Sequence, residues 1–348
     1  MDTREKTFNY IVEKGSTTSK EICEFFGISR QALNKHIKEL IKNNKIIKEG
    51  KTRGVVYSPL TTKKRVRFIK SFEKVYFLSN LEEDKVFHEL ASLLNLKGEL
   101  SNSALDIALY AFTEILNNAI EHSGSEKCNV KVILDEYMFR FFIRDFGIGI
   151  FHSIFKKFNL PDENAAIGEL IKGKTTTMEE KHTGEGIFFT SKSADMIFFR
   201  SHKVKLIFDN QKKDVFIEEK KFIKGTEVVF SISRSSKRRL DKIFTHFAPE
   251  EFDFKFERTR VLVKLFHKDY ISRSEAKRLL YGLDKFTEII LDFKGVKSIG
   301  QGFADEIFRV FLNAYPNIIM KVENISPIIE QIINHVVDKK IKSRLTIS

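Results

Sequence analysis

Strand-like and helix-like patterns alternate along most of this chain, and this alternation limits what it can fold into. The alternation begins near residue 76 and returns in residues 255–345, where the largely apolar run 289–293 precedes a helical pattern over 303–314. Such alternation predicts mixed or parallel sheets with helices packed on them. Because 348 residues exceed one ordinary core, we expect an α/β protein of two or three domains.

Residues 1–58 differ from the rest, because they predict three short helices followed by a hairpin. A polar break separates the first helix from the second, which Ser19 can cap and Gly27 ends. Ser29 then caps a third helix, in which apolar residues return at helical spacing. Two apolar runs around a turn-rich segment complete the pattern as strand, turn and strand.

The basic excess of the chain is concentrated in this N-terminal region. The net charge is +13, and residues 1–70 hold 17 Lys and Arg against 7 Asp and Glu, whereas the remaining residues hold 43 against 40. An excess confined to one segment indicates a polyanionic partner for that segment. The alternative is a surface that only keeps the protein dissolved.

The run TSKEICEFFGISRQALNKHIKEL resembles bacterial winged helix-turn-helix regulators. In such a domain the third helix lies in the major groove of DNA, where Arg, Gln and Asn suit base edges and Lys suits phosphates. The alternative is a small helical domain that binds protein. The expected DNA contacts, on the third helix and at the hairpin tip, are Arg30, Gln31, Asn34, Lys35, Lys38, Lys51 and Arg53.

The segment 59–75, which is rich in Lys and Arg, is predicted to be a basic linker or the entry to a strand.

The two cysteines, Cys23 and Cys128, lack metal-ligand spacing and suggest a reduced protein. The first residues do not form a signal peptide, and no stretch approaches the roughly 18 apolar residues that span a bilayer. We therefore expect a soluble, cytoplasmic protein with no membrane partner.

The first of four motifs in the middle region, residues 76–235, is the run FTEILNNAIEHS. Glu114, Asn118 and His122 are spaced by four, so a helix presents all three on one face. A carboxylate, an amide and an imidazole are unfavourable in an apolar core, but they are suited to holding a metal ion, a water and phosphate oxygens. The apolar residues around them indicate that this helix packs, so the polar face lines a site.

Three further motifs follow in order. Asp145 ends a strand pattern in RDFGIGI, where its carboxylate can accept from an exocyclic amine while the glycines admit a ring. HTGEGI opens a helix, and its glycines expose backbone N–H groups to phosphate. KGTEVVF is a turn that leads into a strand. Each motif alone is weak, because Gly-x-Gly is common.

Together, in this order and at these spacings, the motifs resemble the N, G1, G2 and G3 boxes of the GHKL ATPase superfamily. The resemblance implies a Bergerat-type α/β sandwich that binds ATP and Mg²⁺, with a mobile lid at residues 164–183. It assigns Asn118 to Mg²⁺, Asp145 to the adenine amine and Glu114 to the role of general base. It also puts a further set around the nucleotide: Asn117, His122, Gly147, Gly149, Gly184, Gly186, Ile187 and Thr226.

The pattern Glu-x-x-x-Asn-Ala-x-x-His is more similar to anti-sigma-factor serine kinases than to histidine kinases. A histidine kinase also needs a phosphoacceptor histidine on a dimerising helical hairpin. His88 and the two residues after it mimic that motif, but the helix is short and lacks a hairpin partner. We therefore expect His88 to be a partly buried residue on a packing helix.

Residues 255–345 resemble a STAS-like domain, the fold of anti-sigma-factor antagonists, through the run LDFKGVKSIGQGFADE. This resemblance implies a protein partner. In the antagonists the loop carries a phosphorylatable Ser or Thr, whereas here the equivalent positions hold Gly300, Gln301 and Gly302. The departure argues against an intramolecular kinase–substrate switch. Ser274 is expected to cap the helix that it starts.

The three regions together favour an ATP-binding, DNA-associated regulator, in which binding or hydrolysis of Mg-ATP switches conformation or partner binding. One alternative is an anti-sigma-type protein serine/threonine kinase that acts on a partner. Another is a clamp that forms a homodimer when it binds ATP. The sequence leaves open whether the chain is an ATPase, a protein kinase or neither.

Overall fold

The computed structural model of the chain divides into two compact units, residues 1–67 and 68–348, and each is described by itself. The structure describes residues 3–43, 45–49, 55–59, 68–160, 163–174, 185–253, 255–266 and 270–348. Lys51, Arg53 and Gly184, which the sequence predicted as site residues, lie outside these ranges, as do residues 175–183 of the expected lid.

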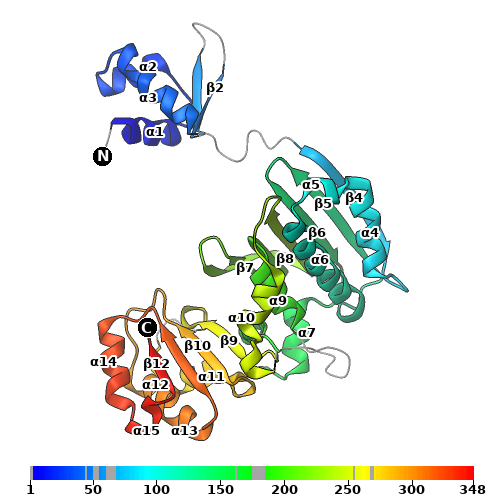
Figure 1. Cartoon of the computed structure of the whole chain (residues 1–348), viewed down its shortest axis with the longest axis vertical. Coiled ribbons are helices and arrows are strands. Elements are labelled where there is room, and N and C mark those ends of the chain that lie inside the picture. The colour runs from blue at the N-terminus through cyan, green and yellow to red at the C-terminus, as the bar shows by residue number, and fades with distance from the viewer. Residues whose placement is uncertain are drawn as a thin grey trace. The chain divides into compact units, whose positions relative to one another are not determined.

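The first unit is a helical domain with a small antiparallel sheet (Figure 1). Its strands pair in the order β1-β3-β2. Ile11, Ile22, Leu33, Ile37 and Leu40 lie in its core and come from all three helices. Its elements are α1 (Thr3–Lys14), β1 (Thr17–Thr18), α2 (Ser19–Phe26), α3 (Arg30–Lys42), β2 (Ile46–Glu49) and β3 (Val56–Pro59).

Short-range signals explain where these helices start and stop. The Ser29 side chain accepts from the Ala32 N–H and caps α3, as predicted. Gly27 ends α2 in the left-handed conformation, with a φ of 63°. The cap of α2 is Thr18 and not Ser19, because Thr18 forms a reciprocal capping box with Glu21.

The second unit begins with a five-stranded sheet on which helices are packed (Figure 1). Its strand order is β4-β5-β6-β8-β7, and every neighbouring pair is antiparallel. The elements are β4 (Phe68–Phe77), α4 (Glu83–Leu94), α5 (Leu96–Glu99), α6 (Asn102–His122), β5 (Lys127–Asp135), β6 (Met138–Asp145), α7 (Ile150–Lys157), α8 (Glu163–Lys172), α9 (Gly186–Ser193), β7 (Met196–Asp209), β8 (Asp214–Ser233) and α10 (Leu240–Phe247).

This sheet corrects two expectations. The alternation of patterns predicted a mixed or parallel sheet, which is wrong here, because short turns join β5 to β6 and β7 to β8 as antiparallel hairpins. Strand β4 also begins at Phe68, inside segment 59–75, so from Phe68 onward this segment is a strand, as the strand-entry alternative had it, and not a linker. Strand β4 forms an edge of the sheet by pairing with β5, which is distant along the chain. The basic composition of the segment does not reveal this pairing.

Strand β6 shows why one of its residues faces the helices. Phe139, Phe141, Ile143 and Asp145 alternate with less buried residues, so all four point to the same face of the sheet. Phe141 packs edge-on against Phe112 of α6, which identifies this face as the one beneath the helices. Asp145 therefore ends the strand on the helix-covered side.

The C-terminal part of the second unit contains a four-stranded parallel sheet in the order β12-β11-β10-β9, as the alternation predicted. The helix after β9 is capped by Ser272 and not by Ser274. No helix in the described ranges combines the length and apolar character needed to cross a membrane. The elements are β9 (Arg258–Leu262), α11 (Arg273–Leu280), β10 (Glu288–Asp292), α12 (Gln301–Asp305), which continues through π-helical turns (Glu306–Phe311) into α13 (Leu312–Ala314), β11 (Ile319–Glu323), α14 (Pro327–Val336), α15 (Lys339–Lys342) and β12 (Leu345–Ile347).

The middle and C-terminal parts share a core. Phe188 and Phe189 of α9 belong to the same apolar cluster as the strands of the parallel sheet, and both rings pack against Phe247 and Phe256. Burial of such rings removes a large apolar area from water, which holds the two parts together.

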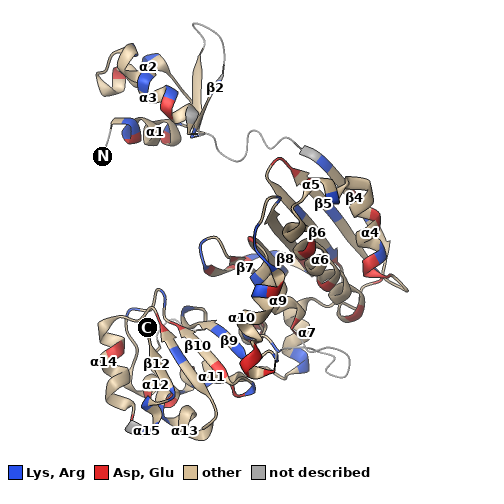
Figure 2. Ribbon diagram, in the orientation of Figure 1, with Lys and Arg blue, Asp and Glu red and all other residues tan. Residues whose placement is uncertain are grey.

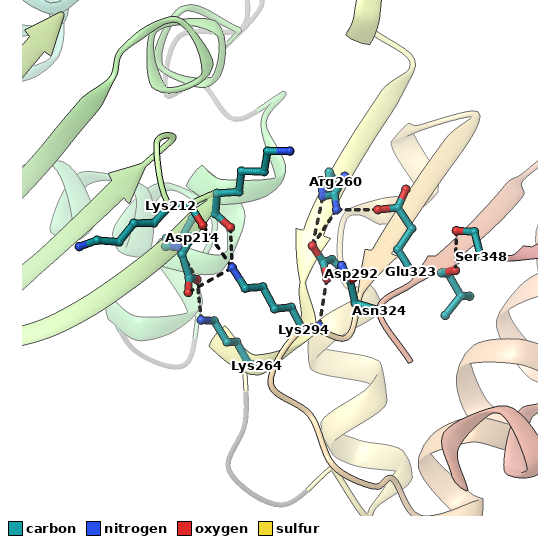
Figure 3. A network of polar contacts seen from close by, with 12 residues as sticks. Lys212, Asp214, Arg260, Lys264, Asp292, Lys294, Glu323, Asn324 and Ser348 are labelled. Carbon is teal, nitrogen blue, oxygen red and sulfur yellow. Dashed lines mark hydrogen bonds and ion pairs between the residues drawn. The ribbon is translucent and has the colours of Figure 1, made fainter. Parts of the chain in front are cut away.

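Polar contacts reinforce the junction (Figure 3). Lys264, from the segment after β9, donates to Asp214 at the start of β8, with 2.5 Å between Nζ and Oδ1. Lys294 reaches the same carboxylate and the backbone carbonyls of the β7–β8 turn. Within the C-terminal part, Arg260 bridges Asp292 and Glu323.

Candidate functional site

A cavity of about 320 Å³ lies among α6, β6, α7, α9 and β8. It brings together residues from all four sequence motifs, although these motifs are spread over more than a hundred positions. The predicted residues that line it are Glu114, Asn117, Asn118, His122, Asp145, Gly149, Gly186, Ile187 and Thr226. Gly147 is not among the lining residues.

One wall of the cavity is the polar face of α6. Glu114, Asn118 and His122 follow one another at successive turns and line the cavity, as the four-residue spacing predicted. The Asn118 side chain donates Nδ2 to the Glu114 backbone carbonyl at 2.6 Å, so its amide oxygen is the end left to accept. Asn117 donates to Glu121 one turn later, at 3.3 Å.

Asp145 is fixed at another wall of the cavity. Its Oδ1 accepts from the backbone N–H groups of Gly147, at 2.9 Å, and Thr226, at 3.2 Å. Burial raises the pKa of the Asp145 carboxyl, and these hydrogen bonds oppose that shift without cancelling it. Thr226 Oγ1 also accepts from the Ile150 N–H at 2.9 Å, which ties the start of α7 to this corner.

Close backbone approaches around Asp145 require glycine. Gly225 has a φ of 77°, and a Cβ there would lie 2.7 Å from Asp145 Oδ1. Gly149 has a φ of 85°, and a Cβ there would lie 2.4 Å from Ser201 Oγ. Gly147 turns out to be needed for the chain itself, since its Cβ would collide with the Ser123 carbonyl. These glycines, from two motifs, therefore shape the backbone around Asp145.

The N-terminus of α9 closes a third side. Gly186 starts this helix and faces Glu114, because a Cβ on Gly186 would lie only 1.8 Å from Glu114 Oε2. Glu185, Gly186 and Ile187 all line the cavity. Helix N-termini carry unsatisfied backbone N–H groups and a partial positive charge, which favour anions.

The cavity also contains residues to which the sequence assigned no role: Ser123 and Glu185 from within the first and third motifs, and Tyr110, Phe199 and Phe244 from outside the motifs. A signal existed for Tyr110, which precedes Glu114 by four residues and so shares its helix face. Burial raises the pKa of Tyr110, and the charges of Glu114 and Glu185 raise it further. Phe244 comes from α10, and no local pattern marks it as a cavity residue.

On the first unit, the predicted DNA-contacting residues of α3 share the exposed side of that helix. Arg30, Gln31, Asn34, Lys35 and Lys38 are all exposed, while Leu33, Ile37 and Leu40 of the same helix are buried. Figure 2 shows basic residues on this helix. Its solvent face therefore offers both the amide and cationic groups that suit a nucleic acid.

Two other predicted positions behave differently. His88 is exposed on α4 and its Nδ1 lies 2.7 Å from the Asp84 carbonyl, so the expectation of a partly buried side chain was wrong. In the antagonist-like loop, the Gly300 N–H donates to the Tyr270 carbonyl, and a Cβ on Gly300 would lie 2.6 Å from the Ile271 carbonyl oxygen. A serine or threonine at this loop position would need the neighbouring backbone to shift.

Two family models match parts of the chain. Residues 2–47 match a winged helix-turn-helix DNA-binding model, and residues 275–330 match a STAS-like domain of unknown function (DUF4325). No curated protein matches the chain in a sequence search. The chain therefore carries a winged helix-turn-helix at its N-terminal end and a STAS-like domain near its C-terminal end, and neither model covers the residues that line the cavity.

Proposed function

We propose that this protein is a DNA-associated regulator whose state is set by Mg-ATP bound in the cavity of a Bergerat-type middle domain. The observation that carries the proposal is the convergence of four separated motifs on one cavity, from Glu114 to Thr226. A chance arrangement would not be expected to gather an acidic strand end, a polar helix face and a glycine-started helix around one space. The match to a winged helix-turn-helix model supports the DNA-binding part.

The Asp145 wall suits the adenine ring. A buried carboxylate that is held by two backbone N–H groups is a specific acceptor for the exocyclic amine of adenine. Ile143, Ile150 and Val228 supply apolar surface at the same wall, as a flat aromatic base requires. An adenine nucleotide is therefore favoured over a sugar or a small acid.

The α6 and α9 walls suit the triphosphate and its metal ion. An amide oxygen on Asn118 is a hard ligand of the type that Mg²⁺ takes alongside phosphate oxygens and water. The N–H groups at the start of α9 would bind phosphate, and His122 lies on the same helix face as Asn118. Glu114 lies against Gly186, where a carboxylate could orient a water beside the terminal phosphate.

A structural route links this cavity to the C-terminal part. Helix α9 contributes Gly186 to the cavity at its first residue, and two and three residues later it contributes Phe188 and Phe189 to the shared core. A shift of α9 on nucleotide binding would therefore disturb the packing of the STAS-like domain. We propose that this domain passes the nucleotide state to a protein partner.

The test uses the full chain and two matched asparagine variants. Calorimetric titration with Mg-ATP should show binding by the wild type and by Asn102→Ala, an exposed position at the start of the same helix. Asn118→Ala should lose the Mg²⁺-dependent part of the affinity. If Asn118→Ala binds Mg-ATP like the wild type, the proposed site is wrong.

The link to DNA is measured separately. Fluorescence anisotropy with labelled duplex DNA should show binding at low salt that weakens steeply as salt rises, because phosphate contacts release counterions. Saturating Mg-ATP should change this affinity in the wild type and leave it unchanged in Asn118→Ala. An absence of DNA binding at low salt would reject the DNA-binding role, and an affinity indifferent to ATP would reject the switch.

A further inference from the structure

Outside the cavity, two histidines and a glutamate from three different elements converge on one point. His152 belongs to α7, Glu163 is the first residue of α8, and His202 lies in β7. The Nδ1 atoms of His152 and His202 lie 3.1 Å and 2.9 Å from the same oxygen, Glu163 Oε1. Among the described residues, these three form the group whose ligand atoms all lie within 4.8 Å of one another.

The spacing of these atoms fits a tetrahedral metal ion. A Zn²⁺ ion takes imidazole nitrogen and carboxylate oxygen at about 2.0–2.2 Å, which separates neighbouring ligand atoms by about 3.3 Å in a tetrahedron. The two distances to Glu163 Oε1 are close to that edge length. The side chains are 19–29% exposed, so an ion and a water ligand could reach them.

The backbone of β7 is distorted where it supplies its histidine. His202 has a φ of 51°, in the left-handed region that non-glycine residues seldom occupy. The pairing of β7 with β8 shifts register on both sides of His202. Bulges of this kind re-aim side chains next to functional sites, and the strain persists only where the surroundings enforce it. Ring stacking on Phe222, at 5.1 Å between centroids, fixes the imidazole in this direction.

We propose that His152, Glu163 and His202 bind a borderline divalent cation, Zn²⁺, with water in the remaining position. Two imidazoles with one carboxylate select transition metals over Mg²⁺, which prefers oxygen ligands. This centre is therefore distinct in chemistry from the magnesium ligand proposed at Asn118. Its competitor is a metal-free arrangement in which both imidazoles donate hydrogen bonds to Glu163.

The position of this centre gives it a structural role. His152 lies three residues after Gly149, a residue of the cavity wall, and a Cβ on Gly149 would lie 3.0 Å from His202 Nε2. A bound cation would join the start of α7, the start of α8 and the β7 bulge. It would therefore stiffen the wall that carries Gly149 and raise the thermal stability of the second unit.

The experiment uses the full chain without an affinity tag, stripped with a chelator and then dialysed. Zn²⁺ should bind at about one equivalent per chain in competition with a chromophoric chelator, and Co²⁺ should give the intense visible absorption of a tetrahedral site. Glu163→Gln and His202→Asn should weaken Zn²⁺ binding by at least about tenfold, since even the loss of an outer-shell partner commonly costs 10- to 100-fold. Asparagine is chosen at position 202 because it tolerates a positive φ.

The matched control is His88→Asn, which removes an exposed histidine on α4 and should bind Zn²⁺ like the wild type. Far-UV circular dichroism checks the fold of each variant, and two substitutions at different elements keep the test valid if one of them unfolds. Wild-type protein that takes up no Zn²⁺, or variants that bind it as tightly as the wild type, would establish the hydrogen-bonded arrangement and overturn the proposal. Failure here would leave the nucleotide proposal untouched, because Mg-ATP binding is measured on different residues.

Discussion

Glu114 of α6 and Gly186 of α9 lie so close that a single methyl group on the glycine would overlap the carboxylate, at 1.8 Å from Oε2. The two residues are 72 positions apart and belong to different motifs. Their contact joins the polar helix face to the helix N-terminus, so the shape of the cavity depends on the absence of a side chain at Gly186.

Gly186→Ala should therefore damage the site more than a substitution at a glycine where a Cβ has room. The new methyl group would turn aside the end of the flexible Glu114 side chain, at a cost of about 1 kcal/mol or less in unfolding free energy, whereas Mg-ATP affinity should fall because the carboxylate is displaced. Gly302→Ala is the control, because this glycine also lies near a helix start and its Cβ would find its nearest atoms at 3.6 Å. Urea unfolding and calorimetric titration measure both effects. Equal behaviour of the two variants would contradict the close contact.

The pH dependence of nucleotide binding should report on Asp145. Burial raises the pKa of the Asp145 carboxyl in the folded, nucleotide-free protein above its unfolded value of about 3.9. Protonation of this carboxyl therefore stabilises the folded protein fully at a pH below 3.9, roughly the unfolded pKa, and this contribution is lost as the pH rises through the raised folded pKa. Adenine binding needs the deprotonated form of Asp145, since the adenine amine donates to the carboxylate. Affinity should thus weaken as the pH falls through the raised pKa of Asp145.

Asp145→Asn isolates that effect. It should bind Mg-ATP at least about tenfold more weakly near neutral pH. The Asn amide would place an N–H donor where the adenine amine or a backbone N–H needs an acceptor. The difference between the two proteins should shrink toward acid pH. Comparing their titrations removes the nucleotide's own protonation, and a constant difference across the pH range would argue against the assigned role.

Substitutions on α3 should separate base contacts from phosphate contacts. Lys35→Ala should reduce the slope of log affinity against log salt by about one unit, as expected when one phosphate contact is lost. Arg30→Ala should cost about 1–3 kcal/mol on a cognate site and less on random DNA. Lys6→Ala removes an equal charge from the exposed side of α1 and serves as the control. Anisotropy titrations over a range of salt concentrations measure all three.

Lys172 should be important for the junction between the middle and C-terminal parts. This buried side chain donates to Glu169 at 2.9 Å and to the Tyr281 carbonyl at 2.5 Å. Lys172→Ala would leave the Glu169 charge buried without this cation, so we expect a loss of about 3–5 kcal/mol. Lys157→Ala, at an exposed position of α7, should change stability little. Chemical unfolding of the full chain tests this, and similar midpoints would contradict it.

Local features of the sequence were enough for the helices of the first unit and for the polar α6 wall of the cavity. Ser29 and Gly27 set helix boundaries through contacts within a few residues, and the spacing of Glu114, Asn118 and His122 places them on one helix face whatever the rest of the chain does. Helical spacing and helix capping depend on residues within a few positions of one another, so the sequence alone can predict them.

Other features depended on contacts between distant segments. Nothing near Phe244 shows that α10 reaches the cavity, and the alternation of patterns did not reveal that the first sheet is antiparallel. The bulge that turns His202 toward His152 and Glu163 arises from the register between two long strands. The sequence by itself determined which chemical groups each motif offers, because these follow from residue type and local period. Only the tertiary structure decided which groups meet, because strand register and helix packing are set by burial summed over the whole core.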